Sequence, residues 1–242
     1  PFRGSDSGAA GLDVISHFYN QRPEGVMCIK ERPWQGLYAD GITTLDYERG
    51  KASSILEDPW QTDDSIGSWG YKAGSPYMTP DLVIDKLIDI VSKNGNMLLN
   101  IPIKADGTID REATALLKNI GKWFRINGEA IYGTRPWYMH GEGHNEIGHK
   151  DLESPMGSRD FRYTTKGDNL YAFVLGWPNA KRKPVVFPNL VKTNTRIGEI
   201  THVQLLGYEG ELEWYNHGDG LQVFFPKEKP CDYAYALKIS FL

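Results

Sequence analysis

Tryptophan and carboxylate side chains are concentrated between residues 57 and 69 of this 242-residue chain. The segment DPWQTDDSIGSWGY holds Trp60 and Trp69 among the acids Asp58, Asp63 and Asp64. An indole ring offers an apolar face, and a carboxylate accepts hydrogen bonds from hydroxyl groups. A sugar presents both kinds of surface, so this combination indicates a carbohydrate site. For either tryptophan the alternative role is packing in the hydrophobic core.

Several acids in this region could act as a general acid or base, and Glu48 is the first candidate. Residues 42–48 (ITTLDYE) alternate as a strand, with Thr44, Asp46 and Glu48 on one face. Glu48 ends that strand, and catalytic groups of parallel barrels lie at the carboxyl ends of strands. Glu57 is the second candidate. The alternative for Glu48 is a surface ion pair with Arg49, which would contribute little.

Histidines and cysteines give weaker signals. His140, His144 and His149 are spaced through a glycine-rich loop, but no helix aligns them and no cysteine accompanies them, so a metal site is not favoured. The two cysteines, Cys28 and Cys231, do not make a disulfide framework. Cys28 lies in the apolar run VMCI and is predicted to be buried.

The elements that would position these residues alternate between strands and helices up to about residue 137. Thr79 and Pro80 begin a helix that Gly95 is expected to end. The other expected elements are helices at 8–19 and 111–127, strands at 26–30, 42–48, 96–102 and 130–133, and a loop at 60–69. This order predicts a parallel sheet.

The pattern changes near His140 to short alternating strands separated by turns. We therefore predict an α/β domain over residues 1–140 and an antiparallel β-sandwich over residues 141–242. The net charge is −4, which gives no electrostatic case for nucleic acid, and no apolar run reaches membrane-spanning length.

Four motifs in family order carry a specific resemblance. WQTDDSIGSWGY, SKNGNMLLNIP, ADGTID and NGEAIYGTRPW closely resemble the α-L-fucosidases of glycoside hydrolase family 29. The resemblance implies the C-terminal half of a (β/α)8-like (TIM) barrel followed by a β-sandwich, with the strands at Val26, Ile42, Met97 and Ala130 as numbers five to eight. It also implies an exo-acting, retaining α-L-fucosidase for fucosylated glycans, with no cofactor, in a secreted, periplasmic or lysosomal-type compartment. Linkage preference and oligomeric state stay open.

The resemblance also assigns roles to residues. The family nucleophile is an aspartate followed by glycine, and it is expected upstream of Pro1, so the chain alone is expected to be inactive. Asp40-Gly41 is set aside because it lies in a loop before a strand. Counting back from Trp60 brings Glu48 to the acid/base position.

The remaining roles concern substrate binding. Arg32 is expected to reach the sugar, the alternative being a solvated loop arginine. Trp60 and Trp69 are expected to contact the fucose methyl group, and Asn100 to hold a neighbour. Two other functions remain open: a sugar-binding or structural half-domain without activity, and a barrel glycosidase for another sugar.

Overall fold

The computed structural model describes residues 9–30, 42–143, 156–178, 183–192, 194, 196 and 198–242. The first elements along the chain are α1 (Ala9–Gln21), β1 (Cys28–Lys30), β2 (Thr44–Glu48), β3 (Trp60–Ser65), α2 (Pro80–Ser92), β4 (Gly95–Asn100), α3 (Arg111–Asn127) and the 3-10 helix η2 (Gly128–Ala130). The later elements are β5 (Arg135–Glu142), β6 (Phe161–Lys166), β7 (Asn169–Val174), β8 (Val185–Phe187), β9 (Ile200–Leu205), β10 (Glu213–His217), β11 (Gly220–Phe224) and β12 (Tyr235–Phe241).

The first four strands form one parallel sheet in the order β1-β2-β3-β4. The expected parallel arrangement is therefore confirmed for these strands. Helix α2 packs on one face of the sheet, where Lys86 pairs with Asp64 of β3 at 2.7 Å. The apolar side chains of α2 face inward, and Val83, Ile84 and Ile88 are all buried.

The later strands form two antiparallel sheets, as the alternating pattern predicts. One has the order β5-β6-β7-β12-β9 and the other β10-β11-β8. A shared core of buried side chains from both sheets includes Tyr163, Phe187, Leu221 and Leu237. β5 pairs with β6 and lies across the predicted division at residues 140 and 141.

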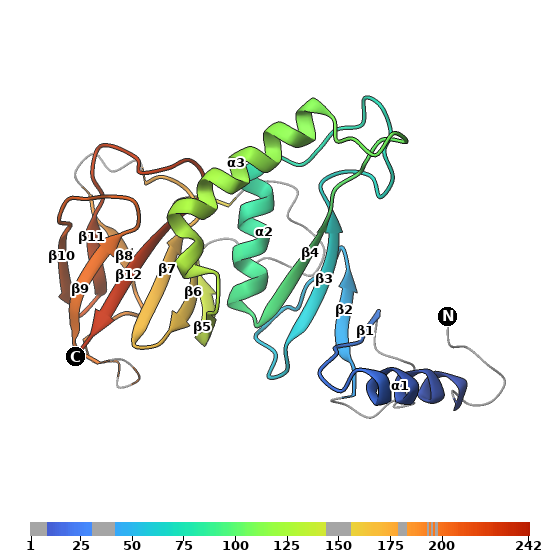
Figure 1. Cartoon of the computed structure of the whole chain (residues 1–242). Coiled ribbons are helices and arrows are strands. Elements are labelled where there is room, and N and C mark those ends of the chain that lie inside the picture. The colour runs from blue at the N-terminus through green and yellow to red at the C-terminus, as the bar shows by residue number, and fades with distance from the viewer. Residues whose placement is uncertain are drawn as a thin grey trace.

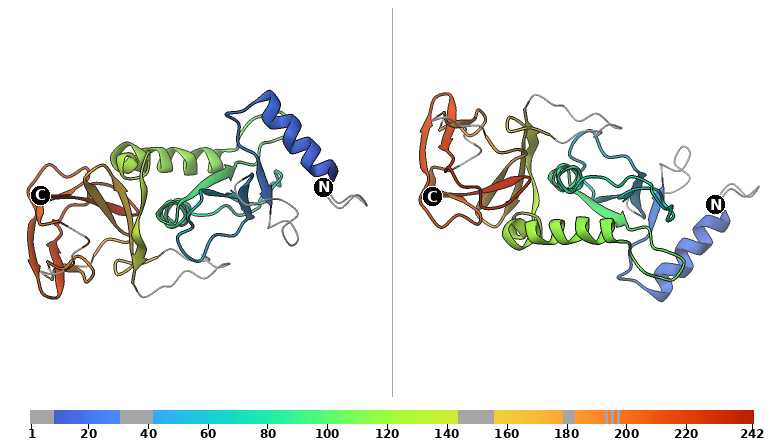
Figure 2. Two further views of the ribbon diagram at one scale, coloured as in Figure 1. Left: turned by 90° about the horizontal axis from the view of Figure 1, so that it is seen from below. Right: turned by 90° about the horizontal axis from the view of Figure 1, so that it is seen from above.

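The two helices α2 and α3 lie between the parallel sheet and the five-stranded sheet (Figures 1 and 2). A second core links them, because buried residues of α2 and α3 cluster with Tyr171, Phe173 and Ala236 of the five-stranded sheet. Trp123 of α3 donates its indole hydrogen to the carbonyl of Ala234 at 2.7 Å. None of the described helices is long and apolar enough to cross a membrane.

Two predicted elements are wrong. The segment from Trp60 to Trp69 is not all loop, because residues 60–65 form β3 in the middle of the parallel sheet. Its sequence, WQTDDS, lacks an apolar run because Asp63 meets Lys30 on one face of the sheet and Asp64 meets Lys86 on the other. Residues 130–133 are not a strand: they continue from α3 as η2 and a turn, in which Ile131 and Tyr132 donate to the carbonyl of Gly128.

The end of α2 also differs from the prediction. Thr79 is the N-cap as expected, but the helix ends at Ser92, and the left-handed residue after it is Asn94 with φ of 70°. Gly95 instead begins β4. A Cβ atom there would lie 2.5 Å from two ring atoms of Trp60, so the close approach of the strand to this indole requires glycine.

A buried group of charges joins α2 to the five-stranded sheet. Asp89 of α2 is fully buried and pairs with Arg162 of β6 at 2.7 Å, Lys93 at 2.9 Å and Lys51 at 3.4 Å. Burial alone would raise the pKa of Asp89, but the three cations hold it below its usual value. Burial also lowers the pKa of Lys51 to about 8. This group, called the Asp89 cluster, consists of Asp89, Lys93, Lys51 and Arg162 and joins three separate parts of the chain.

Asp85, one turn earlier on α2, should make stability depend on pH. Burial raises its pKa to about 8 from 3.8, although its carboxylate accepts the amide hydrogen of Met156 at 2.8 Å. Folding therefore binds a proton, and the protein loses stability as pH rises between these two values. Asp85→Asn stays neutral and keeps an acceptor. Urea unfolding should show the variant more stable by roughly 2–4 kcal/mol at pH 7 and little changed near pH 4.

Asp81→Asn, in the first turn of the same helix, is the matched control and should give no such gain. If Asp85→Asn were destabilising by the same amount at both pH values, Asp85 would be acting as a hydrogen-bond acceptor only.

Candidate active site

One face of the parallel sheet is polar and carries the candidate active site. Strand register places the following side chains on it: Cys28, Lys30, Thr44, Asp46, Glu48, Gln61, Asp63, Ser65, Asn96, Leu98 and Asn100. The shared face predicted for Thr44, Asp46 and Glu48 is thus confirmed. Cys28 is exposed, so its predicted burial is wrong: alternation turns Ile29, and not Cys28, toward the other face.

Glu48 lies at the carboxyl end of β2 and shares a cation with its neighbour on β3. Lys30, the last residue of β1, places its ammonium 2.5 Å from Asp63 Oδ2 and 3.3 Å from Glu48 Oε2. The Glu48 side chain is 51% exposed, whereas that of Asp63 is 14% exposed. Glu48 is therefore the carboxyl group that an incoming molecule can reach, and Asp63 is the one engaged with Lys30.

Trp69 lies beside this charged group. Its ring is 5.7 Å from the Lys30 ammonium and 4.7 Å from the guanidinium carbon of Arg49, so two cations face one indole. Asn100, at the end of β4, donates its amide hydrogens to the Trp69 carbonyl at 3.0 Å and to Ser65 Oγ at 2.9 Å. The prediction that Asn100 holds a neighbour is confirmed.

The backbone also holds Arg49 at this edge. Its φ of 52° lies in the left-handed region, which a side chain other than glycine seldom adopts. Two hydrogen bonds fix it there: its amide donates to the Asp63 carbonyl at 2.9 Å and its guanidinium to the Gly67 carbonyl at 2.8 Å. A strained residue next to Glu48 is typical of functional sites.

Trp60 does not share this location. It is fully buried at the amino end of β3, donates its indole hydrogen to the Lys93 carbonyl at 2.8 Å and packs edge-on against Tyr47. Burial leaves no face for a sugar, so we assign Trp60 to the core. Trp69, by contrast, is 41% exposed.

The competing acids separate by position. Asp64 points to the opposite face and pairs with Lys86. Asp46 shares the face of Glu48 but is buried two residues deeper, where burial and the charge of Asp63 raise its pKa. Glu57 and Asp58 precede β3 at the amino end of the sheet, where the Asn94 amide donates to the Glu57 carbonyl. Glu57, the second candidate from the sequence, is therefore placed away from Glu48.

Several residues singled out in the sequence lie outside the described residues: Arg32, the Asp40-Gly41 pair, His144 and His149. His140 is described, on β5. Burial and the nearby charges of Lys93 and Arg162 lower its pKa to about 4, so it belongs to the surroundings of the Asp89 cluster.

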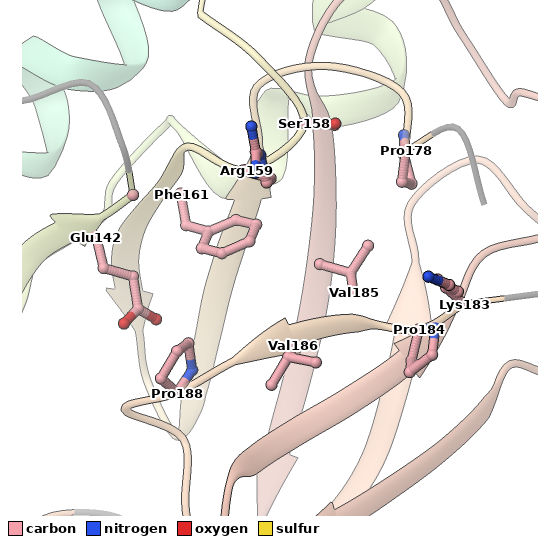
Figure 3. Close-up of a pocket in the computed structure, with 11 residues that line it drawn as sticks. Glu142, Ser158, Arg159, Phe161, Pro178, Lys183, Pro184, Val185, Val186 and Pro188 are labelled. Carbon is pink, nitrogen blue, oxygen red and sulfur yellow. The ribbon is translucent and has the colours of Figure 1, made fainter.

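A hollow of about 570 Å³ lies in the antiparallel half of the protein (Figure 3). Phe161 at the start of β6 and Val185 of β8 face into it, and Arg159 and Lys183 stand near its rim. Glu142, the one carboxylate among the described residues that line it, is already engaged by the Tyr163 hydroxyl and the Asn189 amide. None of the described residues that line this hollow lies on the polar face of the parallel sheet that carries Glu48. We therefore do not assign the hollow to the candidate active site.

Sequence reasoning missed Lys30, which pairs with Glu48, and Asp63, which shares that cation. The ion pair it offered as the alternative, Glu48 with Arg49, is not among the ion pairs of the described residues: Arg49 contacts Trp69 and the Gly67 carbonyl instead. Lys30 ends a strand, as Glu48 does, and adjacent parallel strands bring their carboxyl ends together. A search for charged residues at the carboxyl ends of the two predicted strands would have paired Lys30 with Glu48. Asp63 could not be found in that way, because β3 was interpreted as a loop.

Comparison with protein families agrees with the motifs. Residues 6–129 match the family described as Alpha-L-fucosidase, and residues 155–240 match the family described as Alpha-L-fucosidase C-terminal domain. Among curated proteins, an alpha-L-fucosidase of Branchiostoma floridae is 31% identical over 94% of this chain and 49% of its own length. The plasma alpha-L-fucosidase of Homo sapiens is 31% identical over 93% of this chain and 47% of its own length.

Solved structures share the fold. Alpha-L-fucosidase isoenzyme 1 from Paenibacillus thiaminolyticus matches with a TM-score of 0.74 and 25% identity, covering 100% of this chain and 56% of that one. The Thermotoga maritima alpha-fucosidase, solved in complex with fucose, matches with a TM-score of 0.71 and 24% identity, covering 97% of this chain and 49% of that one. The chain thus spans about half the length of the curated relatives it matches.

Proposed function

The chain belongs to the α-L-fucosidase family, and from that premise we propose that the protein is an exo-acting α-L-fucosidase that releases terminal α-linked L-fucose with retention of configuration. Residues 1–140 would supply the C-terminal half of a (β/α)8-like barrel, and residues 141–242 a β-sandwich. The parallel order β1-β2-β3-β4, with α2 on one face, supports the first assignment. The two antiparallel sheets around one core support the second.

The placement of Glu48 is the observation that carries this proposal. Among the described residues, it is an exposed carboxyl group at the carboxyl ends of the parallel strands, beside an exposed indole. A retaining mechanism needs one carboxyl group as acid/base and a second as nucleophile. We assign the acid/base role to Glu48, and the nucleophile role to the aspartate of the family's Asp-Gly pattern.

Substrate binding divides between charged and apolar contacts. Trp69 is the apolar surface at this edge, and we assign to it the contact with the C5-methyl group of fucose. Arg32, two residues after β1, is proposed to donate hydrogen bonds to the sugar hydroxyls.

The direct test is hydrolysis of an aryl α-L-fucoside by the full-length gene product. NMR of the first-formed fucose should show the α anomer, as retention requires. Fucose binding without turnover would favour a sugar-binding half-domain. Turnover of another glycoside with no action on fucosides would favour a barrel glycosidase of different specificity.

Trp69→Ala tests the assignment of the methyl contact. Losing the indole should weaken fucose binding by roughly 1–3 kcal/mol, because that is the range for burying an apolar group of this size. Titration calorimetry on the full-length protein measures it directly.

Tyr215→Ala, which removes an exposed aromatic side chain from the antiparallel half, is the control and should leave fucose affinity unchanged. Unchanged affinity in Trp69→Ala as well would mean that Trp69 only packs beneath Arg49 and does not contact the sugar.

A further inference from the structure

Lys30 and Asp63 form a charge pair that the proposed chemistry does not by itself require. The Lys30 ammonium lies closer to Asp63 Oδ2, at 2.5 Å, than to Glu48 Oε2, at 3.3 Å. The hydrogen bond to Asp63 raises the pKa of Lys30 above its usual value, so the cation is held in its charged form. Among the described residues, the other charged groups at this edge are Asp46 on the same face of β2 and Arg49 over Trp69.

We propose that Lys30 and Asp63 are positioning residues that set the charge balance around Glu48 and thereby fix the pH range in which Glu48 acts as a proton donor. This inference rests on the proposed function of Glu48. The two residues act in opposite directions. Lys30 places a positive charge beside Glu48, and Asp63 places a negative charge beside Lys30.

The geometry favours this role over a general structural ion pair. Lys30 is the last residue of β1, and Asp63 of β3 lies level with Glu48, the last residue of β2. The charge pair therefore lies at the exposed carboxyl-end edge of the sheet rather than in a core. The Lys30 side chain is 48% exposed and its ammonium contacts two carboxylates at once. Exposed ion pairs contribute little to stability, so removing this one should alter the site without unfolding the protein.

The same contacts distinguish Asp63 from a nucleophile. A nucleophilic carboxylate must be free to attack the sugar, whereas one oxygen of Asp63 is engaged with Lys30 and the other, Oδ1, is buried. Asp63 is therefore placed to influence Glu48 through Lys30.

The test compares Lys30→Met and Asp63→Asn in the full-length gene product. For an aryl fucoside, the alkaline limb of the kcat/KM profile reports loss of the proton from the acid group. Lys30→Met leaves Glu48 beside an anion, so that limb should move up by about one pH unit. Asp63→Asn leaves Glu48 alone with the cation, so the limb should move down by about one unit. Lys30→Arg keeps the charge and should restore the wild-type profile.

Lys86→Met is the matched control, because it removes a lysine–aspartate pair from the opposite face of the same sheet. It should leave both limbs in place. Lower rates at every pH with no shift of either limb in Lys30→Met and Asp63→Asn would overturn the proposal. So would loss of turnover in Asp63→Asn that azide restores with inverted product, because Asp63 would then be the nucleophile.

A readout without turnover separates this inference from the proposed function. If the gene product hydrolyses no fucoside, the proposed function fails. Carbon-13 NMR of the Glu48 carboxyl group then decides the inference: opposite shifts of its titration in the two variants support it, and shifts in one direction overturn it.

Discussion

Replacing Asp89 with alanine should cost roughly 3–5 kcal/mol of folding free energy, because removing one partner leaves buried charges uncompensated. Three cations, from Arg162, Lys93 and Lys51, contact this one fully buried carboxylate. The loss is a large share of the total stability of about 5–15 kcal/mol that is usual for a domain. Chemical denaturation followed by circular dichroism measures it.

The effect should also appear at the contact between the two halves of the protein. Arg162 belongs to β6 of the five-stranded sheet, whereas Asp89 belongs to α2 beside the parallel sheet. Without the carboxylate, the cations of both sides repel one another across this contact. We therefore expect the unfolding transition to broaden, with near-ultraviolet signals from Trp123 lost before the far-ultraviolet signal.

Asp81→Ala on the same helix is the control, and it should cost at most about 1 kcal/mol, the usual contribution of a carboxylate in the first turn of a helix. Asp89→Asn provides a second variant that keeps the shape of the side chain. If both Asp89 variants unfolded like Asp81→Ala, bound water or anions would have to compensate the three cations, and the Asp89 cluster would not be what joins the halves.

The sequence predicted elements well where one physical signal dominated. Thr79 and Pro80 began α2 as expected, and α3 has the predicted bounds of residues 111 and 127, with Asp110 accepting the amide hydrogen of Ala113 at 2.8 Å. These signals are local, since a cap depends on residues within one turn. The alternation in β2 was equally local and placed Glu48 on the correct face.

Predictions failed where an element depended on what surrounds it. β3 is central in its sheet, but Asp63 faces Lys30 and Asp64 faces Lys86, so partners distant in sequence make its polar side chains compatible with a strand. Trp60 was placed at the sugar site because carboxylates neighbour it in sequence. Only the three-dimensional structure shows that its ring fills the space above Gly95.

The candidate active site was predicted in part for the same reason. Glu48 could be found because position along a strand indicates position along a barrel axis. The charge environment of Glu48 could not be predicted in this way. Lys30 and Asp63 lie 18 and 15 residues away from Glu48 in the sequence, and only the register of β1, β2 and β3 brings them beside it. Family motifs identify the group that acts, whereas the structure identifies what surrounds it.

Glu48→Gln should give the largest change in activity of any single substitution in this chain. An acid/base residue donates a proton to the leaving oxygen and then removes one from water, so its loss affects both steps. A natural fucoside has a poor leaving group, and its turnover by the full-length protein should fall by about 10²–10⁴-fold. An aryl fucoside with an acidic phenol needs no proton, so its first step should change far less.

Azide distinguishes this role from a general disturbance of the site. As a small anion it needs no base, so it should replace water in the second step and raise turnover of the aryl fucoside by Glu48→Gln, giving a fucosyl azide of retained configuration. Glu57→Gln is the matched control, because Glu57 lies at the amino end of the sheet, and it should behave as wild type. Equal slowing of both substrates by Glu48→Gln, with no response to azide, would remove Glu48 from the acid/base role and leave Asp63 as the next carboxyl group to test at this edge.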